Sequence, residues 1–127
     1  MMFALLLALG ADPEAAAVDP DCGGNTVEMV QCANRSFDRA DRELNSLWRD
    51  IADDLGRQDR QFDDHLEPRL DIAQKAQNAW LAFRDAQCAA YADLEGRGGT
   101  IYPLIYIGCR TDMTRERIEH LRPLVGK

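Results

Sequence analysis

The sequence contains only two histidines, and its four cysteines include no Cys-x-x-C pair. Structural zinc sites and thioredoxin-like redox sites commonly use such paired cysteines, so both kinds of site have little support. His65 and His120 are the remaining candidate metal ligands, and neither lies near a cysteine in the sequence. We therefore expect no metal and no cofactor.

Basic residues are also fewer than acidic residues. The 127-residue chain has 15 Lys and Arg residues against 22 Asp and Glu residues, which gives a formal net charge of −7. Nucleic acids and anionic membranes attract basic patches, so neither is an expected partner. An acidic surface instead favours a cationic partner. At 46% hydrophobic and 29% charged residues, the composition is that of one folded domain.

Long hydrophobic runs are missing beyond the first residues, MMFALLLAL. This run is too short to span a bilayer and is typical of the apolar core of a signal peptide, although no Lys or Arg precedes it. Small residues allow cleavage after Gly10, Ala15 or Ala17. We take residues 1–17 as the signal peptide and residues 18–127 as the mature domain, with no stable membrane insertion after cleavage.

The four cysteines predict two disulfides, because an even number in a small exported chain is typical of an oxidised framework. Such a framework indicates the periplasm or the outside of the cell. Of the three possible connectivities, chain geometry favours one. Cys22 lies in a loop just before Cys32, and Cys88 and Cys109 are almost equidistant from a glycine turn. The predicted bridges are Cys22–Cys32 and Cys88–Cys109, both acting as structural staples.

A long helix is predicted from Asn25, which is a good N-cap with Glu28 three positions later. Apolar residues then recur at steps of three and four, which places them on one helix face. This first stripe consists of Val30, Ala33, Phe37, Ala40, Leu44, Leu47, Ile51 and Leu55, widened by Trp48. Gly56 is expected to end or break the helix.

A second helix is predicted after a polar connection over residues 57–64, with Pro68 in its first turn. Its apolar stripe is read as Ala73, Ala76, Trp80, Phe83, Ala90 and Leu94, with Gln87 at one step. Gly96, Gly98 and Gly99 end this helix and open a turn.

Pro103 begins a third helix, which Pro123 and Gly126 end. Its inward face is expected to contain Leu104 or Ile105, together with Cys109, Met113 and Leu121. The predicted fold is all-α, an antiparallel hairpin of two long helices closed by a shorter third helix. This hairpin would bring Phe37 near Trp80.

These residues resemble the LprI-like lysozyme-inhibitor family, a group of small exported bacterial domains. The resemblance covers residues 22–121 and rests on the order of its elements. The matching residues are Cys22, Cys32-Ala33, Phe37, Ala40-Asp41, Leu44-Asn45, Trp48, Gln77, Trp80, Phe83-Arg84-Asp85-Ala86, Cys88, Gly98-Gly99-Thr100, Cys109, Met113-Thr114, Arg117 and Leu121. The family commonly has Tyr where this chain has Phe37 and Trp48.

The resemblance implies that the exported protein binds a lysozyme and blocks it by steric occlusion. Animal lysozymes are cationic and cleave with two carboxylates in a cleft, so an acidic domain could be steered to them. The candidate blocking loop consists of Gly96, Arg97, Gly98, Gly99, Thr100 and Tyr102, with Tyr102 as an aromatic anchor. The alternative function is a structural or stress-related interaction domain of the cell envelope, without lysozyme inhibition.

Six polar residues stand beside the apolar stripes and allow two interpretations. They are Asp41, Asn45, Arg84, Asp85, Thr114 and Arg117. One interpretation is a ligand-binding cluster between the helices. The other is a structural network in which Arg84 pairs with an acid such as Asp41 and Arg117 pairs with Asp85, fixing the register of the helices.

Catalysis has little support in the sequence, and we expect no enzyme. No motif places a pair of carboxylates in an apolar pocket, as an acid–base mechanism requires. Ser36 and Ser46 lie within the first predicted helix, away from any nucleophile-elbow pattern. His65 follows two aspartates and is read as a solvated linker residue. Trp48 and Trp80 are read as core residues.

Overall fold

The computed structural model describes residues 22–125, so the predicted signal peptide lies outside the described residues. Three α-helices follow one another, with no strand among these residues. They are α2 (Thr26–Gln61), α3 (Arg69–Gly96) and α4 (Tyr102–Leu121), and a 3₁₀ helix η1 (Arg122–Leu124) follows α4. None of the helices in this part of the chain is long and apolar enough to cross a membrane.

Helix α2 begins at the predicted cap. The Asn25 side chain accepts a hydrogen bond of 2.9 Å from the Glu28 backbone N–H and donates one of 3.1 Å to the Glu28 carboxylate.

Helix α2 does not end at Gly56, so that expectation was wrong. A helical glycine costs only about 1 kcal/mol, and Asp54 accepts hydrogen bonds from Arg57 and Gln58 across this point.

Helix α3 receives its cap from α2 and not from a neighbouring residue. The two oxygens of Asp59 accept hydrogen bonds from the backbone N–H groups of Arg69 at 2.9 Å and Leu70 at 3.0 Å. Pro68 directly precedes the helix and provides no side-chain cap. Asp59 thereby satisfies two of the free N–H groups at the start of α3 and joins the two long helices at one end.

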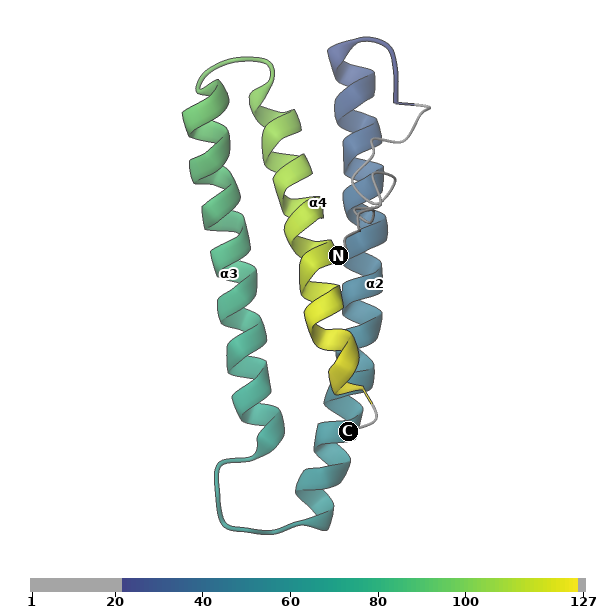
Figure 1. Ribbon diagram of the computed structural model, residues 1–127, viewed down its shortest axis with the longest axis vertical. Coiled ribbons are helices and arrows are strands. Elements are labelled where there is room, and N and C mark those ends of the chain that lie inside the picture. Colours follow the sequence, from purple (N-terminus) through teal and green to yellow (C-terminus); the bar gives the residue numbers. More distant parts are fainter. Residues whose placement is uncertain (1–21, 126–127) are drawn as a thin grey trace, which may run out of the picture.

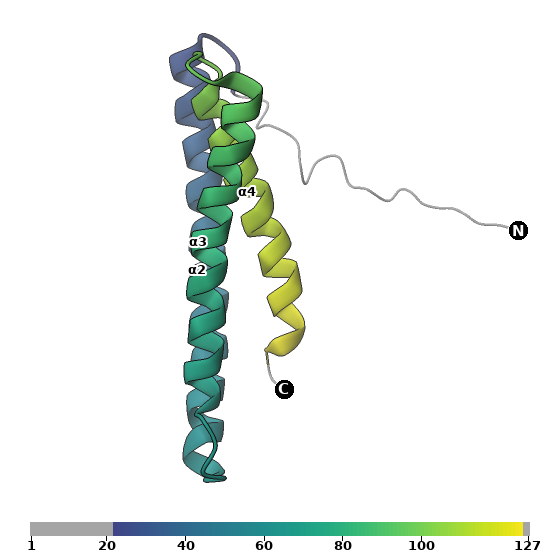
Figure 2. The same cartoon turned by 90° about the vertical axis from the view of Figure 1, so that its left-hand side faces the viewer.

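The three helices lie side by side along one axis (Figure 1). Helix α4 packs against both long helices, and contacts between α2 and α3 are fewer than those that either makes with α4. The α3–α4 turn and the Cys22 loop lie at the same end of the bundle, and the α2–α3 connection lies at the other end (Figures 1 and 2). The predicted all-α hairpin of two long helices with a shorter third helix is confirmed.

The apolar core lies mainly between α2 and α4. Leu44 and Ile51 from α2 pack with Ile118 and Leu121 from α4, and all four are at most 5% exposed. Partly buried residues surround this cluster, namely Leu47, Trp48, Leu55 and Trp80. The first predicted stripe therefore faces inward as expected, and both tryptophans contribute to the core.

The predicted inward face of α3 was wrong except at Trp80, which packs against the core, and Ala73, which is half-buried. Phe83 is 56% exposed and Leu94 is 84% exposed. The buried residues of α3 are instead Gln77, Arg84, Cys88 and Ala92. Apolar periodicity failed here because the inner face of α3 is largely polar and forms its own hydrogen bonds.

The inward face of α4 agrees with the prediction in part, since Leu121 is buried and Cys109 and Met113 contact Cys88 of α3. Its buried residues are Ile107, Thr111, Thr114, Ile118 and Leu121. Leu104, Ile105, Cys109 and Met113 are only half-buried. The reason is that α4 contacts two helices, so its buried side chains lie on more than one face.

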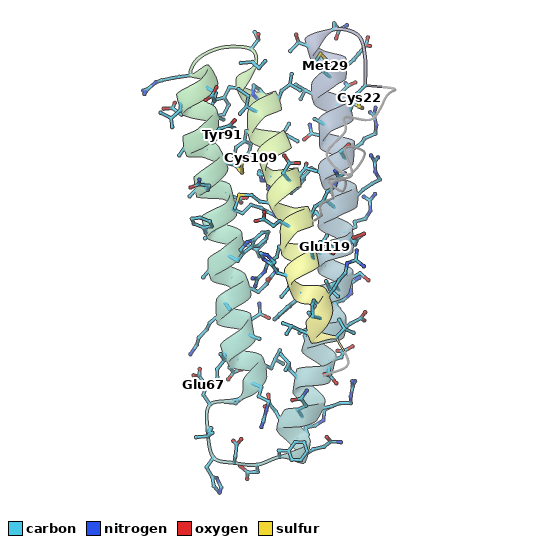
Figure 3. The ribbon with its side chains drawn as sticks, in the orientation of Figure 1. Cys22, Met29, Glu67, Tyr91, Cys109 and Glu119 are labelled. Carbon is cyan, nitrogen blue, oxygen red and sulfur yellow. A yellow bond between two sulfur atoms is a disulfide. The ribbon has the colours of Figure 1, made fainter. Side chains whose placement is uncertain are left out.

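Both predicted disulfides are present. Cys22 and Cys32 lie with their Cα atoms 5.4 Å apart, and those of Cys88 and Cys109 are 5.5 Å apart. Cys109 lies in the space between α3 and α4 (Figure 3). The second bridge therefore fixes the rotation of α3 toward α4.

Candidate functional site

The six polar residues predicted beside the apolar stripes include a buried arginine, Arg84, and we call the group around it the polar cluster. Arg84 is 4% exposed, and its guanidinium carbon lies 5.2 Å from the centre of the Phe37 ring and 5.4 Å from that of Trp80. The predicted proximity of these two rings thus takes the form of a shared cation–π contact. Arg84 also donates a hydrogen bond of 3.2 Å to the hydroxyl of Thr114. One residue of the cluster therefore links all three helices.

Two acids balance the charge of Arg84. Its Nε atom lies 2.9 Å from Asp85 Oδ1, and its Nη1 atom lies 3.9 Å from Asp41 Oδ1, as the sequence predicted for Asp41. Asp41 in turn accepts a hydrogen bond of 3.5 Å from Asn45 at the surface. The cluster therefore extends from the core to the exposed side of α2.

Arg110 is a member of the cluster that sequence reasoning missed. Its Nε atom donates a hydrogen bond of 2.9 Å to Asp85 Oδ1. Its guanidinium carbon lies 4.1 Å from the centre of the Phe37 ring and 5.1 Å from that of Tyr106. Asp85 is thus shared by Arg84 and Arg110.

The expected pair of Arg117 with Asp85 was wrong. Arg117 donates hydrogen bonds of 3.1 and 3.0 Å to the amide oxygen of Gln77, and its guanidinium carbon lies 5.4 Å from the centre of the Trp80 ring. Burial lowers the pKa of Arg117. A neutral amide satisfies this cation because Asp85 lies with Arg84 and Arg110 instead.

The contacts of the six predicted polar residues favour the structural interpretation. Within residues 22–125, no buried side-chain nitrogen or oxygen lacks a hydrogen-bond partner. A ligand site would need polar groups that are free to bind, whereas these groups are bonded to one another or to Gln77 and Arg110. We therefore interpret the cluster as a network that fixes the register of the three helices.

Two carboxylates hold their charge with the help of the fold. The hydrogen bond from the Leu70 N–H, together with the contacts from Arg69, lowers the pKa of Asp59. Burial acts to raise the pKa of Asp85, but hydrogen bonds from Arg84 and Arg110 outweigh it, and the net shift is downward. Both groups therefore bind protons more weakly in the folded chain than in the unfolded chain.

Stability is expected to fall at acid pH. A carboxylate with a lowered pKa stabilises the fold above its unfolded pKa of about 3.9, and this contribution is lost as the pH falls toward the folded pKa. We expect the urea concentration at the midpoint of unfolding to be constant between about pH 5 and 7 and to decrease below about pH 4. The variant D59N should show a smaller decrease than the native chain, and D53N, at an exposed site, should show the same decrease. Equal pH dependence in D59N and the native chain would contradict the role of Asp59.

An open hollow lies beside α4 where that helix ends partway along the two longer helices. Its volume is about 460 Å³. Its walls are mainly apolar, and the lining residues are Trp48, Ile51, Leu55, Gln58, Ala73, Ala76, Arg117, His120, Leu121 and Leu124.

The described residues contain no group of three or more His, Cys, Asp or Glu side chains arranged to hold a metal ion.

The predicted blocking loop forms a tight, exposed turn between α3 and α4. Gly98 has a φ angle of 73°, a conformation that favours glycine. The N–H of Gly99 donates a hydrogen bond of 2.9 Å to the carbonyl of Gly96. The Tyr102 ring is half-buried and stacks on Tyr106 with centroids 6.3 Å apart, so Ile101, at 52% exposed, is the protruding apolar side chain.

A second exposed loop, which the sequence analysis did not single out, joins α2 to α3 over residues 62–68. It contains three acids, and Glu67 lies at this end of the bundle (Figure 3). Phe62 is 58% exposed and Leu66 is 74% exposed. Exposed apolar side chains among acids would suit a cationic protein surface. The signal in the sequence was the occurrence of Phe62 and Leu66 within a short acidic connection.

Local hydrogen bonds order this α2–α3 loop. The N–H of His65 donates to Asp63 at 3.3 Å, and the N–H of Leu66 donates to Asp64 at 3.1 Å. His65 has a φ angle of 63°, which is uncommon for a residue other than glycine. Arg69 also pairs with Asp64 at 3.2 Å. The loop therefore has a defined shape, which lowers the entropy cost of binding a partner.

A protein-family model described as lysozyme inhibitor LprI matches residues 20–121 of the chain. The chain is also similar to an uncharacterized protein of Rhizobium meliloti (strain 1021). The identity is 32% over 126 residues, and the alignment covers 95% of this chain and 90% of that protein. No solved structure matches the chain. The matched range includes all four cysteines and every residue of the polar cluster.

Proposed function

Because the chain belongs to the LprI family of lysozyme inhibitors, we propose that it binds a lysozyme and blocks the cleft by steric occlusion. The family match over residues 20–121 is the observation that carries the proposal. In this mechanism the protein is not an enzyme and needs no cofactor. Inhibition is stoichiometric, because one bound domain covers one cleft.

The charge of the chain supports a cationic partner. The net charge is −7 for the full chain and −5 without Asp12 and Glu14 of the predicted signal peptide, and it would attract an animal-type lysozyme over distances of about 10 Å at moderate salt. Such attraction mainly accelerates association, and close apolar contacts then supply the affinity. Inhibition should therefore weaken as salt rises, through slower association.

The α3–α4 turn, residues 96–102, is our first candidate for the blocking element. It lies at one end of a long bundle (Figure 1), which allows it to enter a cleft without a clash from the helices. Its residues from Arg97 to Ile101 are exposed, and Gly98 and Gly99 keep it narrow. The hydrogen bonds within the turn hold its shape before binding.

The α2–α3 loop is the second candidate for the same function. It lies at the opposite end of the bundle and contains Asp63, Asp64 and Glu67 beside two exposed apolar side chains. The acidic residues favour the α2–α3 loop, because they would attract a cationic lysozyme. The narrow backbone of the α3–α4 turn favours that turn instead. One protein cannot insert both ends into one cleft, so single substitutions distinguish them.

We also propose that the protein acts in the periplasm or outside the cell. The two disulfides support this location, since such bonds persist in oxidising compartments. Intact mass of the exported protein tests the proposal. We expect cleavage within residues 10–17 and a mass about 4 Da below that of the reduced chain.

A cell-wall lysis assay tests the inhibition. Oxidised protein comprising residues 18–127 is titrated against an animal-type lysozyme, together with the variants Ile101→Ser, Leu66→Ser and Leu124→Ser. Substitution in the blocking loop should weaken inhibition at least about tenfold, because a central apolar contact is lost. Leu124→Ser is the matched control, since Leu124 is 50% exposed and lies in η1, outside both loops.

Saturable inhibition that only one of the two loop variants weakens would identify the blocking loop. Inhibition equally insensitive to both loop variants would contradict an end-on mechanism. Absence of inhibition at concentrations far above that of the enzyme would overturn the proposal and favour an interaction domain of the cell envelope.

A further inference from the structure

Helix α3 has an apolar stripe on its outer side. Ile72, Phe83 and Leu94 are 53%, 56% and 84% exposed. Exposed alanines fill the positions between them, at residues 76, 79, 86 and 90. The steps of three and four place all of these residues on one face of the helix. Helix α3 forms one side of the bundle (Figure 1), and all residues of this outer stripe are exposed, with Ala76 at its edge beside the hollow.

The outer stripe is uncharged over most of its length. Between Ala76 and Tyr91, the charged residues of α3 are Arg84 and Asp85, and both bond within the polar cluster. The chain as a whole is 29% charged, so such a surface is unusual for it. Exposed apolar surfaces of this kind mark places where proteins associate.

We propose that the outer stripe pairs with the same stripe of a second copy of this chain, in antiparallel orientation. Ile72 and Leu94 each lie eleven residues from Phe83, and Ala76 and Ala90 each lie seven residues from it. A two-fold axis at Phe83 therefore places Ile72 of one copy opposite Leu94 of the other, and Ala76 opposite Ala90. The alanines allow the two helices to approach closely around the central pair of phenylalanines.

The charges beside the stripe favour a second copy in this orientation. Lys75 and Asp93 lie on the same flank of α3, eight and ten residues from Phe83. Each also has an exposed ion pair within the chain, Lys75 with Glu67 and Asp93 with Arg97. Antiparallel pairing brings Lys75 of one copy within two residues, or about 3 Å along the axis, of Asp93 of the other. In a parallel pair, Lys75 of one copy and Asp93 of the other would lie 18 residues, or about 27 Å, apart along the axis and could not pair. A cationic protein or an anionic membrane would find no complementary charge along the stripe.

The pairing is expected to be weak and reversible. The stripe from Ile72 to Leu94 is about 33 Å long and one helix wide, which is small for a permanent interface. We expect a dimer whose dissociation constant lies between about 1 μM and 1 mM, and sedimentation equilibrium over that range of concentration measures it.

Substitution at the centre of the stripe tests the interface. Phe83→Asp and Ala86→Glu should each raise the dissociation constant at least about 30-fold, because each buries charge at the centre of the contact. Both sites are exposed in the single chain, so circular dichroism should be unchanged. Leu66→Asp is the control, since Leu66 is 74% exposed and lies outside the stripe. A monomer throughout, or a dimer that neither stripe variant weakens, would overturn the proposal.

Charge reversal tests the orientation. Lys75→Asp and Asp93→Lys should each weaken the dimer about fivefold, and the double variant should restore it, because opposite charges again face each other. Two weakened single variants without rescue in the double variant, or single variants with unchanged affinity, would overturn the antiparallel register. Lysozyme inhibition is measured separately, and its presence or absence leaves this result unaffected.

Discussion

Replacement of Arg84 by alanine is expected to lower the free energy of unfolding of the oxidised protein by about 3 kcal/mol. The substitution removes the donor to Thr114, one of the two arginines on Asp85, and the cation between Phe37 and Trp80. Thr114 is fully buried, so its hydroxyl would lose a partner where water has little access. Asp85 is 44% exposed and keeps Arg110, which limits the loss.

Urea unfolding of the native chain and two variants measures this effect. Arg84→Lys should be intermediate, because an ammonium group keeps the charge but cannot donate to Asp85 and Thr114 in the geometry of a guanidinium. Arg97→Ala is the matched control, since the Arg97 side chain is 83% exposed and its pair with Asp93 lies at the surface. A loss for Arg84→Ala no larger than that of the control, within about 0.5 kcal/mol, would contradict the structural role of the cluster.

Removal of the Cys88–Cys109 bridge is the second large effect. The two residues are 21 positions apart, and closing a loop of that size stabilises a fold by about 3 kcal/mol through the unfolded chain. The bridge also holds the polar face of α3 toward α4, and the sulfur of Met113 lies 3.5 Å from that of Cys88. The double variant Cys88→Ala, Cys109→Ala should therefore lose about 3 kcal/mol or more.

The other bridge provides a comparison. Cys22 and Cys32 are 10 positions apart and join a loop to the first turns of α2, so their replacement by alanine should cost less, about 2 to 3 kcal/mol. Its effect should be confined to the start of α2, which hydrogen exchange would show as faster exchange there. Equal losses for the two double variants, or a larger loss for Cys22 and Cys32, would contradict the assignment of the inner bridge as the main staple.

Helix positions and cysteine pairing could be predicted because both depend on local or nearly local information. The cap at Asn25, the glycines after α3 and the position of Pro103 are visible within a few residues. The pairing of Cys88 with Cys109 followed from their distances to the turn. Gly56 was misread because glycine permits a helix to end but does not require it.

The rotation of α3 could not be predicted from apolar periodicity alone. The helix has two candidate faces, and the more apolar one contains Phe83 and Leu94. The disulfide was the better guide, since Cys88 must face Cys109 and lies on the other face. Hydrophobic patterning assumes that polar residues face water, and that assumption fails where Gln77 and Arg84 are paired inside.

The polar cluster could be predicted only in part. The contact between Arg84 and Asp41 was found, but Asp85 was assigned to Arg117 and not to Arg110. A signal was present in the spacing, since Arg110, Thr114 and Arg117 recur at steps of four and three on one face of α4. To decide which arginine pairs with a given carboxylate, one must know how two helices are shifted along their axes relative to each other. A single sequence does not provide this axial register.

Competition with a chito-oligosaccharide tests the proposed steric occlusion most directly. Binding of the oxidised protein to an animal-type lysozyme is measured by calorimetry while the sugar, which occupies the cleft, is raised. We expect the apparent affinity to fall in proportion to the occupancy of the cleft, because one lysozyme cannot hold both ligands. Simultaneous binding of the sugar and the protein, or no binding of the protein, would contradict the mechanism.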